Sequence, residues 1–305
     1  MSEYLDRYYI LGYQEFPHKT IKSLRGIGIP DDLMKVVTST DDPNLSGIKE
    51  ECKAEGLPGP LVFDREKFLH DRYLSLMPER VVRKRFPKTD TPARRFISYH
   101  EHKMYERLGL RVYAVMDDDI TFRRVNPFRR DQSVDFDHKM WDRARKALSV
   151  PQVWSCTFVI PFTFSASRDS GTEILNDGDF SQWNRKSASS NQSIWILQND
   201  EYHQWYSPIV CDYITSARYA AIGRTSVCMT EYANMGNPNT DGAIWSQDDP
   251  ADRNNHANHV AAQRIMGCSY RKTGNKPYIK NIRYTYPHQL EERLQYTYPN
   301  QLVER

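Results

Sequence analysis

Three consecutive carboxylates follow an apolar, partly β-branched run in the first half of the chain. The run covers residues 110–116, and Asp117, Asp118 and Asp119 come directly after it. This pattern predicts a buried strand with the carboxylates where the chain leaves the sheet, an edge at which open α/β sheets bind ligands. Alternate residues of an extended segment point the same way, so Asp117 and Asp119 offer oxygen ligands suited to Mg²⁺ or Mn²⁺. A solvated acidic turn is the alternative interpretation.

Basic side chains lie on both sides of these carboxylates. Residues 79–95 hold seven arginines and lysines against two acidic residues, and four arginines follow between positions 123 and 130. Basic clusters beside an acidic site suit a phosphate-rich partner, either a nucleotide or a nucleic acid. A solvated basic face is the alternative for the first cluster.

Strand and helix patterns alternate with short connections before the aspartates. The pattern predicts strands over residues 8–13, 33–38, 60–63 and 110–116, and helices over residues 18–26, 45–55 and 93–108. This alternation is typical of βαβ units, so we expect an α/β fold with a mostly parallel sheet flanked by helices.

The second half of the chain is richer in loops. We expect helices over residues 136–148 and 252–266, a strand over 153–162, apolar runs at 194–197 and 208–213, and loops at 165–192 and 234–249. A twelve-residue motif occurs twice near the carboxyl terminus, beginning at Tyr284 and at Tyr296. We therefore divide the chain into residues 1–130, 131–283 and a tail, 284–305.

The composition excludes several classes of protein. The chain has 305 residues, 39% of them hydrophobic, and a formal net charge of +3. Mean hydropathy is −0.73 and no apolar run approaches the length of a membrane span. The amino terminus has no signal-peptide pattern. The five cysteines are far apart with no CxxC pair, so we expect reduced thiols in a cytoplasmic protein, in the host cytoplasm if a phage encodes it.

The order of these features resembles the nucleotide-sugar half of GT-A glycosyltransferases. A first strand ends at Tyr13 and Gln14, a second ends at Asp41, and a helix that carries Arg94 and Arg95 leads into the strand before the aspartates. The resemblance implies that the first two strand ends bind the nucleoside and that an arginine approaches the diphosphate. The aspartates would bind the metal that bridges the two phosphates of a UDP-sugar, with Asp117 and Asp118 near the donor and Asp117 and Asp119 on the metal.

Residues 116–124 look closest to phage glycosyltransferases found with TET-type oxygenases, which modify 5-hydroxymethylated pyrimidines in DNA. The resemblance implies a DNA acceptor, whose phosphates basic side chains would contact. The expected DNA contacts are Arg83, Lys84, Arg85, Arg123 and Arg124.

Such enzymes need a further metal ligand and, in inverting members, a carboxylate base. Asp248 and Asp249 precede the predicted helix that carries His256 and His259, which lie on neighbouring positions of one helix face. We expect Asp249, or Asp248, to act as general base and the histidines to bind metal. Helix capping by the aspartates and surface exposure of the histidines are the alternatives.

Two other functions compete with this hypothesis. One is a glycosyltransferase that acts on a polysaccharide or a protein. The other is a phage structural protein of the neck or tail, which the Tyr- and Trp-rich second half and the repeated tail favour. The structural protein predicts no binding of metal or nucleotide.

Overall fold

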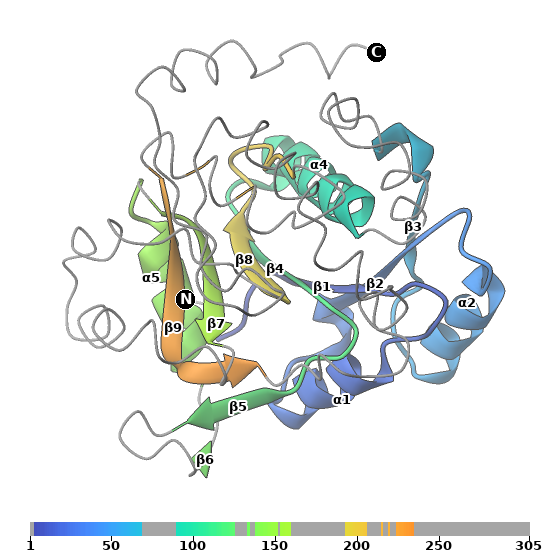
Figure 1. Cartoon of the computed structure of the whole chain (residues 1–305), viewed down its shortest axis with the longest axis horizontal. Helices are drawn as coiled ribbons and strands as arrows, with labels where there is room; N and C mark the ends of the chain where they lie inside the picture. Colours follow the sequence, from blue (N-terminus) through green and yellow to red (C-terminus); the bar gives the residue numbers. More distant parts are fainter. Residues whose placement is uncertain are drawn as a thin grey trace, which may run out of the picture.

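The computed structural model describes residues 3–68, 90–125, 133–134, 138–151, 153–159, 193–205, 215, 219 and 224–234. Within these residues the chain forms one nine-stranded mixed sheet, in the order β3-β2-β1-β4-β8-β7-β9-β5-β6 (Figure 1). The predicted helix over 252–266, the apolar run at 208–213 and the repeated tail lie outside the described residues.

The amino-terminal part builds the parallel half of this sheet. Its four strands pair in parallel, as the predicted βαβ units require. The strands are β1 (Arg7–Leu11), β2 (Met34–Ser39), β3 (Leu61–Phe63) and β4 (Val112–Met116), and the helices between them are α1 (His18–Gly26), α2 (Leu45–Ala54) and α4 (Thr91–Leu108), with 3-10 turns η1 (Asp31–Leu33) and η2 (Glu66–Phe68). The predicted α/β class is confirmed, and α1 has the predicted bounds.

The remaining strands extend the same sheet past β4. Strand β8 pairs antiparallel with β4 and β7, whereas β9 pairs parallel with β7 and antiparallel with β5. The elements are β5 (Phe122–Val125), β6 (Ser133–Val134), α5 (Lys139–Leu148), β7 (Val153–Val159), β8 (Ile194–Gln198) and β9 (Thr225–Asn234). The sequence pattern predicted neither β5 nor β9. Strands from both sides of the proposed boundary at residue 130 therefore share one sheet.

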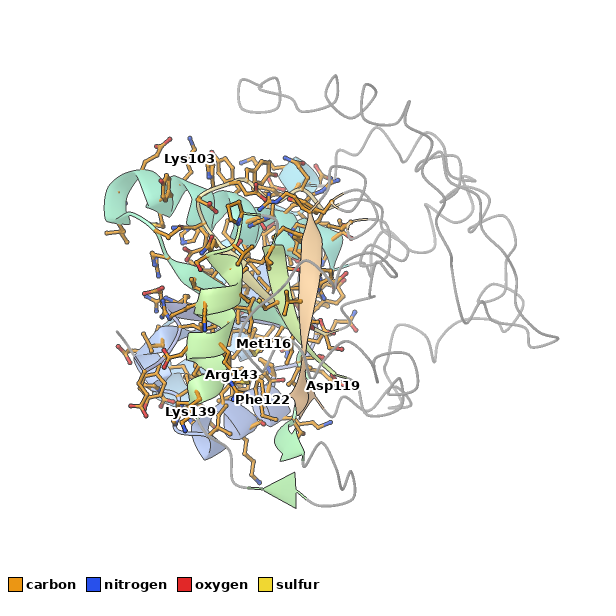
Figure 2. The ribbon with its side chains drawn as sticks, turned by 90° about the vertical axis from the view of Figure 1, so that its left-hand side faces the viewer. Lys103, Met116, Asp119, Phe122, Lys139 and Arg143 are labelled. Carbon is orange, nitrogen blue, oxygen red and sulfur yellow. The ribbon has the colours of Figure 1, made fainter. Side chains whose placement is uncertain are left out.

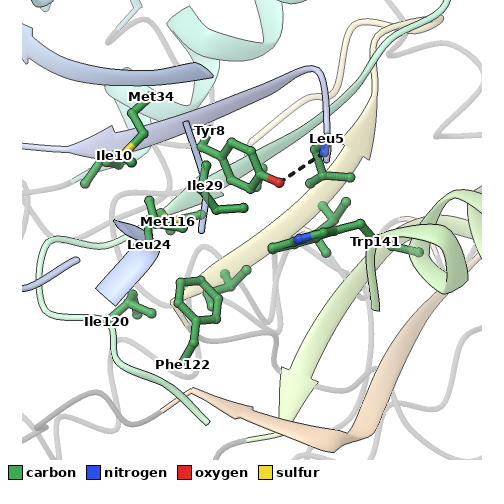
Figure 3. Packing of buried hydrophobic residues seen from close by; sticks show 14 of the residues in the cluster. Leu5, Tyr8, Ile10, Leu24, Ile29, Met34, Met116, Ile120, Phe122 and Trp141 are labelled. Carbon is green, nitrogen blue, oxygen red and sulfur yellow. Dashed lines mark hydrogen bonds between the residues drawn. The ribbon is translucent and has the colours of Figure 1, made fainter. Parts of the chain in front are cut away.

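Alternating side chains give this sheet two buried faces. On one face, Tyr8 and Ile10 of β1 pack with Ile21 and Leu24 of α1 and with Trp141 of α5. Figure 3 shows this packing, in which the Tyr8 hydroxyl accepts a 3.0 Å hydrogen bond from the Leu5 amide. Helices α1 and α2 thus lie on one side of the parallel strands and α4 lies on the other (Figure 1).

Helix α4 covers the second face with a polar surface. In a helix over these residues, Phe96, Ile97, Met104 and Leu108 can share one face. Leu108 is nevertheless 62% exposed, whereas Arg94, Arg95, Ser98 and Glu101 are buried with Ile97. The buried polar groups have hydrogen-bond partners on neighbouring elements. The Trp205 indole donates to Ser98 Oγ at 2.9 Å, and the Tyr9 hydroxyl donates to Glu101. Hydrogen bonding removes most of the cost of burying them.

Two further expectations from the sequence can be compared with the structure. Among the described residues, no helix has the length and apolar character needed to cross a membrane. Among the described side chains, those of Cys52 and Cys156 are buried free thiols.

Candidate functional site

The three aspartates lie where β4 leaves the sheet, as predicted. The Asp117 amide donates to the Ser193 carbonyl at 3.0 Å, which joins the end of β4 to the start of β8. Asp118 and Asp119 then form a turn that leads to β5. Figure 2 shows Met116, Asp119 and Phe122 in one region, far from Lys103 on α4. The chain therefore presents its carboxylates at the carboxyl edge of the parallel strands.

Arg94 of helix α4 contacts the first of these aspartates. Its Nη2 donates to Asp117 Oδ1 at 2.8 Å, its Nε donates to Asp90 Oδ2 at 2.5 Å, and its guanidinium lies 5.3 Å from the centre of the Trp205 ring. The Arg94 side chain is only 5% exposed, whereas that of Asp117 is 31% exposed. A buried positive charge is thus held beside a carboxylate that a ligand can reach.

The electrostatics of the turn favour a bound cation. Burial raises the pKa of Asp117 to about 7; the Arg94 guanidinium opposes this rise, and nearby carboxylates add to it. Partial burial and the charge of Asp119 also raise the pKa of Asp118. Carboxylates with raised pKa values are costly to ionise side by side, and a cation or a ligand rich in hydrogen-bond donors relieves that cost.

A second cluster lies at the ends of β1 and β2. Asp42 is buried and accepts hydrogen bonds from the Gln14 amide at 3.1 Å, the Asn44 amide at 2.8 Å and the Thr38 hydroxyl at 2.6 Å. Gln14 has a φ of 66°, in the left-handed region that non-glycine residues seldom adopt. Asp42 therefore fixes the backbone at the position where Gln14 was expected to meet a nucleoside.

Beside it, Arg65 organises the residues after β2 and β3. Its guanidinium lies 4.6 Å from the centre of the Tyr13 ring, its Nε lies 3.2 Å from the Asp41 carboxylate, and its Nη2 donates to Ser39 Oγ at 3.2 Å. Partial burial raises the pKa of Asp41, but hydrogen bonds from Ser39 and Arg65 outweigh it, so the pKa lies below its ordinary value. Tyr13 and Asp41 are thus brought together by a residue that the sequence reasoning missed.

These clusters share one edge of the sheet. Strand β1 lies between β2 and β4, and all three run in parallel, so Tyr13, Asp41 and Asp117 follow carboxyl ends on the same side. Neighbouring strands are about 5 Å apart, so the two clusters lie within reach of one extended ligand. Arg95 is placed elsewhere, because its Nε donates to the Trp205 carbonyl at 2.6 Å and its Nη1 to the Phe68 carbonyl at 3.2 Å.

Several expected site residues cannot be placed. The general-base and metal-ligand candidates lie outside the described residues, as do three of the expected DNA contacts: Asp248, Asp249, His256, His259, Arg83, Lys84 and Arg85. Arg123 and Arg124 are located by their backbone in β5, paired with Ala233 and Tyr232 of β9. Among the described residues, no group of three or more histidine, cysteine, aspartate or glutamate side chains is arranged to hold a metal ion.

Four residues at this edge were missed by the sequence reasoning. Arg65, Asp42, Asp90 and Thr20 all contact predicted site residues. Two of them had a sequence signal: Arg65 is a basic residue two positions after the third strand, and Asp42 follows Asp41 at the end of the second strand.

Two solved structures are similar to this chain over most of its length, whereas no family model and no curated protein matches its sequence. Both are of glucosyl-3-phosphoglycerate synthase from Mycobacterium tuberculosis. The complex with phosphoglyceric acid has 9% identity and a TM-score of 0.44, covering 93% of this chain and 90% of that chain. The complex with Mn²⁺, UDP-glucose and phosphoglyceric acid has 10% identity and a TM-score of 0.42, covering 94% and 91%. Both TM-scores are below 0.5, so the evidence on function lies in the residues of the site.

Proposed function

We propose that the chain is a metal-dependent glycosyltransferase of the GT-A type that uses a UDP-sugar. One observation carries this proposal. The buried Arg94 guanidinium lies 2.8 Å from Asp117 at the same sheet edge as the Tyr13–Arg65–Asp41 cluster. A nucleotide diphosphate needs an aromatic or polar surface for its nucleoside and positive charge for its phosphates, and this edge offers both.

The reaction needs charge stabilisation more than proton transfer at the donor. The leaving group is a nucleoside diphosphate, and its developing negative charge is stabilised by an arginine and a divalent cation. Arg94 supplies the arginine, with Asp90 and Trp205 fixing its orientation. It would exchange part of its contact with Asp117 for the diphosphate. Arg95 donates to backbone carbonyls, so it supports the fold rather than the donor.

The carboxylates of the turn fit a divalent cation such as Mn²⁺ or Mg²⁺. They are hard oxygen donors. Burial raises the pKa of Asp117, with a smaller contribution from the neighbouring carboxylates, and a bound cation would favour the charged form of the carboxylate. Asp117 and Asp119 would hold the ion, with Asp118 in a supporting position. Mg²⁺ in such sites retains waters and binds substrate phosphates, so two carboxylates from residues 1–130 can be enough protein ligands in the donor half. His256 and His259 are the proposed further ligands.

The other end of the donor would lie on the β1–β2 edge. Tyr13, Gln14 and Asp41 are proposed to contact the nucleoside, and Arg65 holds Tyr13 and Asp41 in place. Residues 1–130 would then bind the donor and residues 131–283 the acceptor, with Asp249 or Asp248 as general base.

Thermal unfolding with nucleotide diphosphates and Mn²⁺ tests the donor site. Ligand at a hundred times its Kd stabilises a protein by about 2.7 kcal/mol. We expect a metal-dependent shift with UDP in the wild type that is lost in Asp119→Ala. If no nucleotide shifts the wild type, the glycosyltransferase is excluded and the phage structural protein becomes the better hypothesis.

For the acceptor, we propose 5-hydroxymethylated pyrimidine in phage DNA. The support is the likeness of residues 116–124 to enzymes of that class, together with the basic residues Arg83, Lys84, Arg85, Arg123 and Arg124. Binding to DNA should weaken steeply as salt rises, because phosphate contacts release counterions. Binding that is weak and insensitive to salt would favour a polysaccharide or protein acceptor.

A further inference from the structure

Thr20 of helix α1 contacts both ends of the aspartate turn. Its side chain is fully buried. Its hydroxyl donates to the Asp117 carbonyl at 2.8 Å and accepts from the Ile120 amide at 2.8 Å. A single hydroxyl group therefore joins the first and last residues of the four-residue segment whose two middle residues are Asp118 and Asp119.

We infer that Thr20 is a positioning residue for the metal site, an inference that rests on the proposed function. The separation of the Asp117 and Asp119 carboxylates depends on the backbone between them. Thr20 makes two hydrogen bonds to this backbone, one donated and one accepted, and a third joins the Asp117 amide to the Ser193 carbonyl. Thr20 thus sets the geometry in which the two carboxylates meet a cation.

The charge of the turn makes such support necessary. Asp118 and Asp119 lie beside Asp117, and their mutual repulsion opposes a compact turn until a cation binds. A neutral hydroxyl can hold the backbone without neutralising any carboxylate. The turn is then held in place before a cation binds. The buried Thr20 hydroxyl both donates and accepts a hydrogen bond, so its polar group is satisfied. Mutation of groups that support metal ligands in this way typically lowers metal affinity by about 10- to 100-fold.

Ser23 supplies a matched comparison on the same helix. Its Oγ accepts from the Phe122 amide at 2.8 Å, beyond the turn and at the start of β5. Ser23 therefore attaches the strand to α1 without touching the segment that carries the carboxylates. If hydroxyl groups of α1 only stabilise the fold, removal of either one should have the same consequences.

The test measures Mn²⁺ binding directly, by electron paramagnetic resonance, with and without UDP. Thr20→Val keeps the shape of the side chain and loses both hydrogen bonds, so we expect its Mn²⁺ affinity to fall by roughly 10- to 100-fold. Thr20→Ser keeps the hydroxyl and should bind as the wild type does. Ser23→Ala should lose stability in urea unfolding but keep its Mn²⁺ affinity.

The possible results separate the role of Thr20 from the proposed function. Equal Mn²⁺ affinity in the wild type and Thr20→Val overturns the role of Thr20 and leaves the glycosyltransferase intact. A wild type that binds no Mn²⁺, alone or with UDP, overturns the proposed function and the role of Thr20 with it. Should Thr20→Val not fold, Thr20→Cys replaces it; its thiol is a weaker donor and acceptor, and an affinity equal to that of the wild type again overturns the role of Thr20.

Discussion

Arg94 joins helix α4 to the end of strand β4 through a 2.8 Å hydrogen bond from its Nη2 to Asp117 Oδ1. The same guanidinium donates to Asp90 one helical turn earlier, so one cation serves two carboxylates. Arg94 is nearly inaccessible, and Asp117 is about one third exposed. The positive charge is therefore fixed by the fold, and its carboxylate partner faces the position where we place the diphosphate.

Arg94→Ala should weaken both the fold and the donor site. Removing a charged hydrogen-bond partner from a buried position costs about 1–3 kcal/mol, and urea unfolding measures that loss. UDP affinity should also fall by at least roughly tenfold, since a lost charge-assisted contact is worth more than about 1.4 kcal/mol. Isothermal titration of UDP in the presence of Mn²⁺ measures that fall.

Arg25→Ala is the matched control for this change. Arg25 also pairs with two carboxylates, those of Asp31 and Glu55, but its side chain is 33% exposed and belongs to α1. Ion pairs with this exposure contribute about 1 kcal/mol or less. The control should keep the UDP affinity of the wild type. Arg94→Ala with unchanged UDP affinity would remove Arg94 from the donor site.

Arg65→Leu should separate recognition of the nucleoside from recognition of the phosphates. Arg65 contacts the Tyr13 ring, Ser39 and Asp41, which lie at the ends of β1 and β2. The cation–π contact and the hydrogen bonds of Arg65, which hold Tyr13 and Asp41 in place, are together worth about 1–2 kcal/mol of interaction free energy. We expect a roughly tenfold lower affinity for uridine without phosphates or metal, whereas Arg94→Ala should leave uridine affinity unchanged.

Lys67→Ala provides the control at that edge. Lys67 lies two residues after Arg65, is 75% exposed and pairs with Asp64 at 3.5 Å. It carries the same charge but has no described contact with Tyr13 or Asp41. A fall in uridine affinity in Lys67→Ala equal to that in Arg65→Leu would indicate a general effect of charge and would contradict the nucleoside site.

The parallel strands could be predicted because their local sequence reports their environment. Strand β4 is apolar throughout and is buried on both faces, so its sequence alone identifies it. Strand β9 begins with Thr225, Ser226 and Val227 and has no such run; its pairing with β7 and β5 depends on residues far away in the chain. Pairing between strands that are far apart in the chain cannot be predicted from the local sequence pattern.

The site could be predicted to the level of the strand ends but not of single side chains. Arg94 and Arg95 are adjacent, and a helix turns by about 100° per residue, so their side chains point in different directions. Arg94 donates to Asp117, whereas Arg95 donates to backbone carbonyls. Neither residue type nor spacing distinguishes them. The role of Thr20 depends on how α1 packs against the aspartate turn, which no sequence motif reports.

Glu201→Gln should change how stability depends on pH. Burial raises the pKa of Glu201, but His203 and Arg224 outweigh it and lower the pKa to about 2. Its Oε1 lies 3.0 Å from His203 Nδ1, and its side chain is 33% exposed. Because the folded-state pKa is below the ordinary value, the stabilisation is present above about pH 4.5 and is lost as pH falls toward 2.

Urea unfolding at several pH values measures this dependence. The glutamine variant should be about 1–2 kcal/mol less stable than the wild type near neutral pH, a figure reduced for partial exposure, and the difference should shrink on acidification. Glu66→Gln serves as the control, since Glu66 lies in η2 and its backbone amide, which the substitution keeps, donates to Asp64. A constant difference at all pH values would contradict the assigned role of the Glu201 charge.

Asp41 and Asp42 are adjacent, but their substitution should reduce stability by different amounts. Asp42 is buried, and its carboxylate accepts from two backbone amides and the Thr38 hydroxyl, so Asp42→Ala leaves buried donors without an acceptor. That loss should cost about 2–3 kcal/mol in urea unfolding. Asp41 is 53% exposed and pairs with Arg65, so Asp41→Ala should cost less than about 1 kcal/mol.

The ligand affinities of the two variants complete this comparison. Asp41→Ala should lower uridine affinity, because Asp41 belongs to the cluster that we assign to the nucleoside. Its effect on binding should then exceed its effect on stability, which separates contact with a ligand from support of the fold. If Asp41→Ala binds uridine as the wild type does, Asp41 acts only as a partner of Arg65, and Tyr13 and Gln14 are left as the proposed nucleoside contacts on the β1–β2 edge.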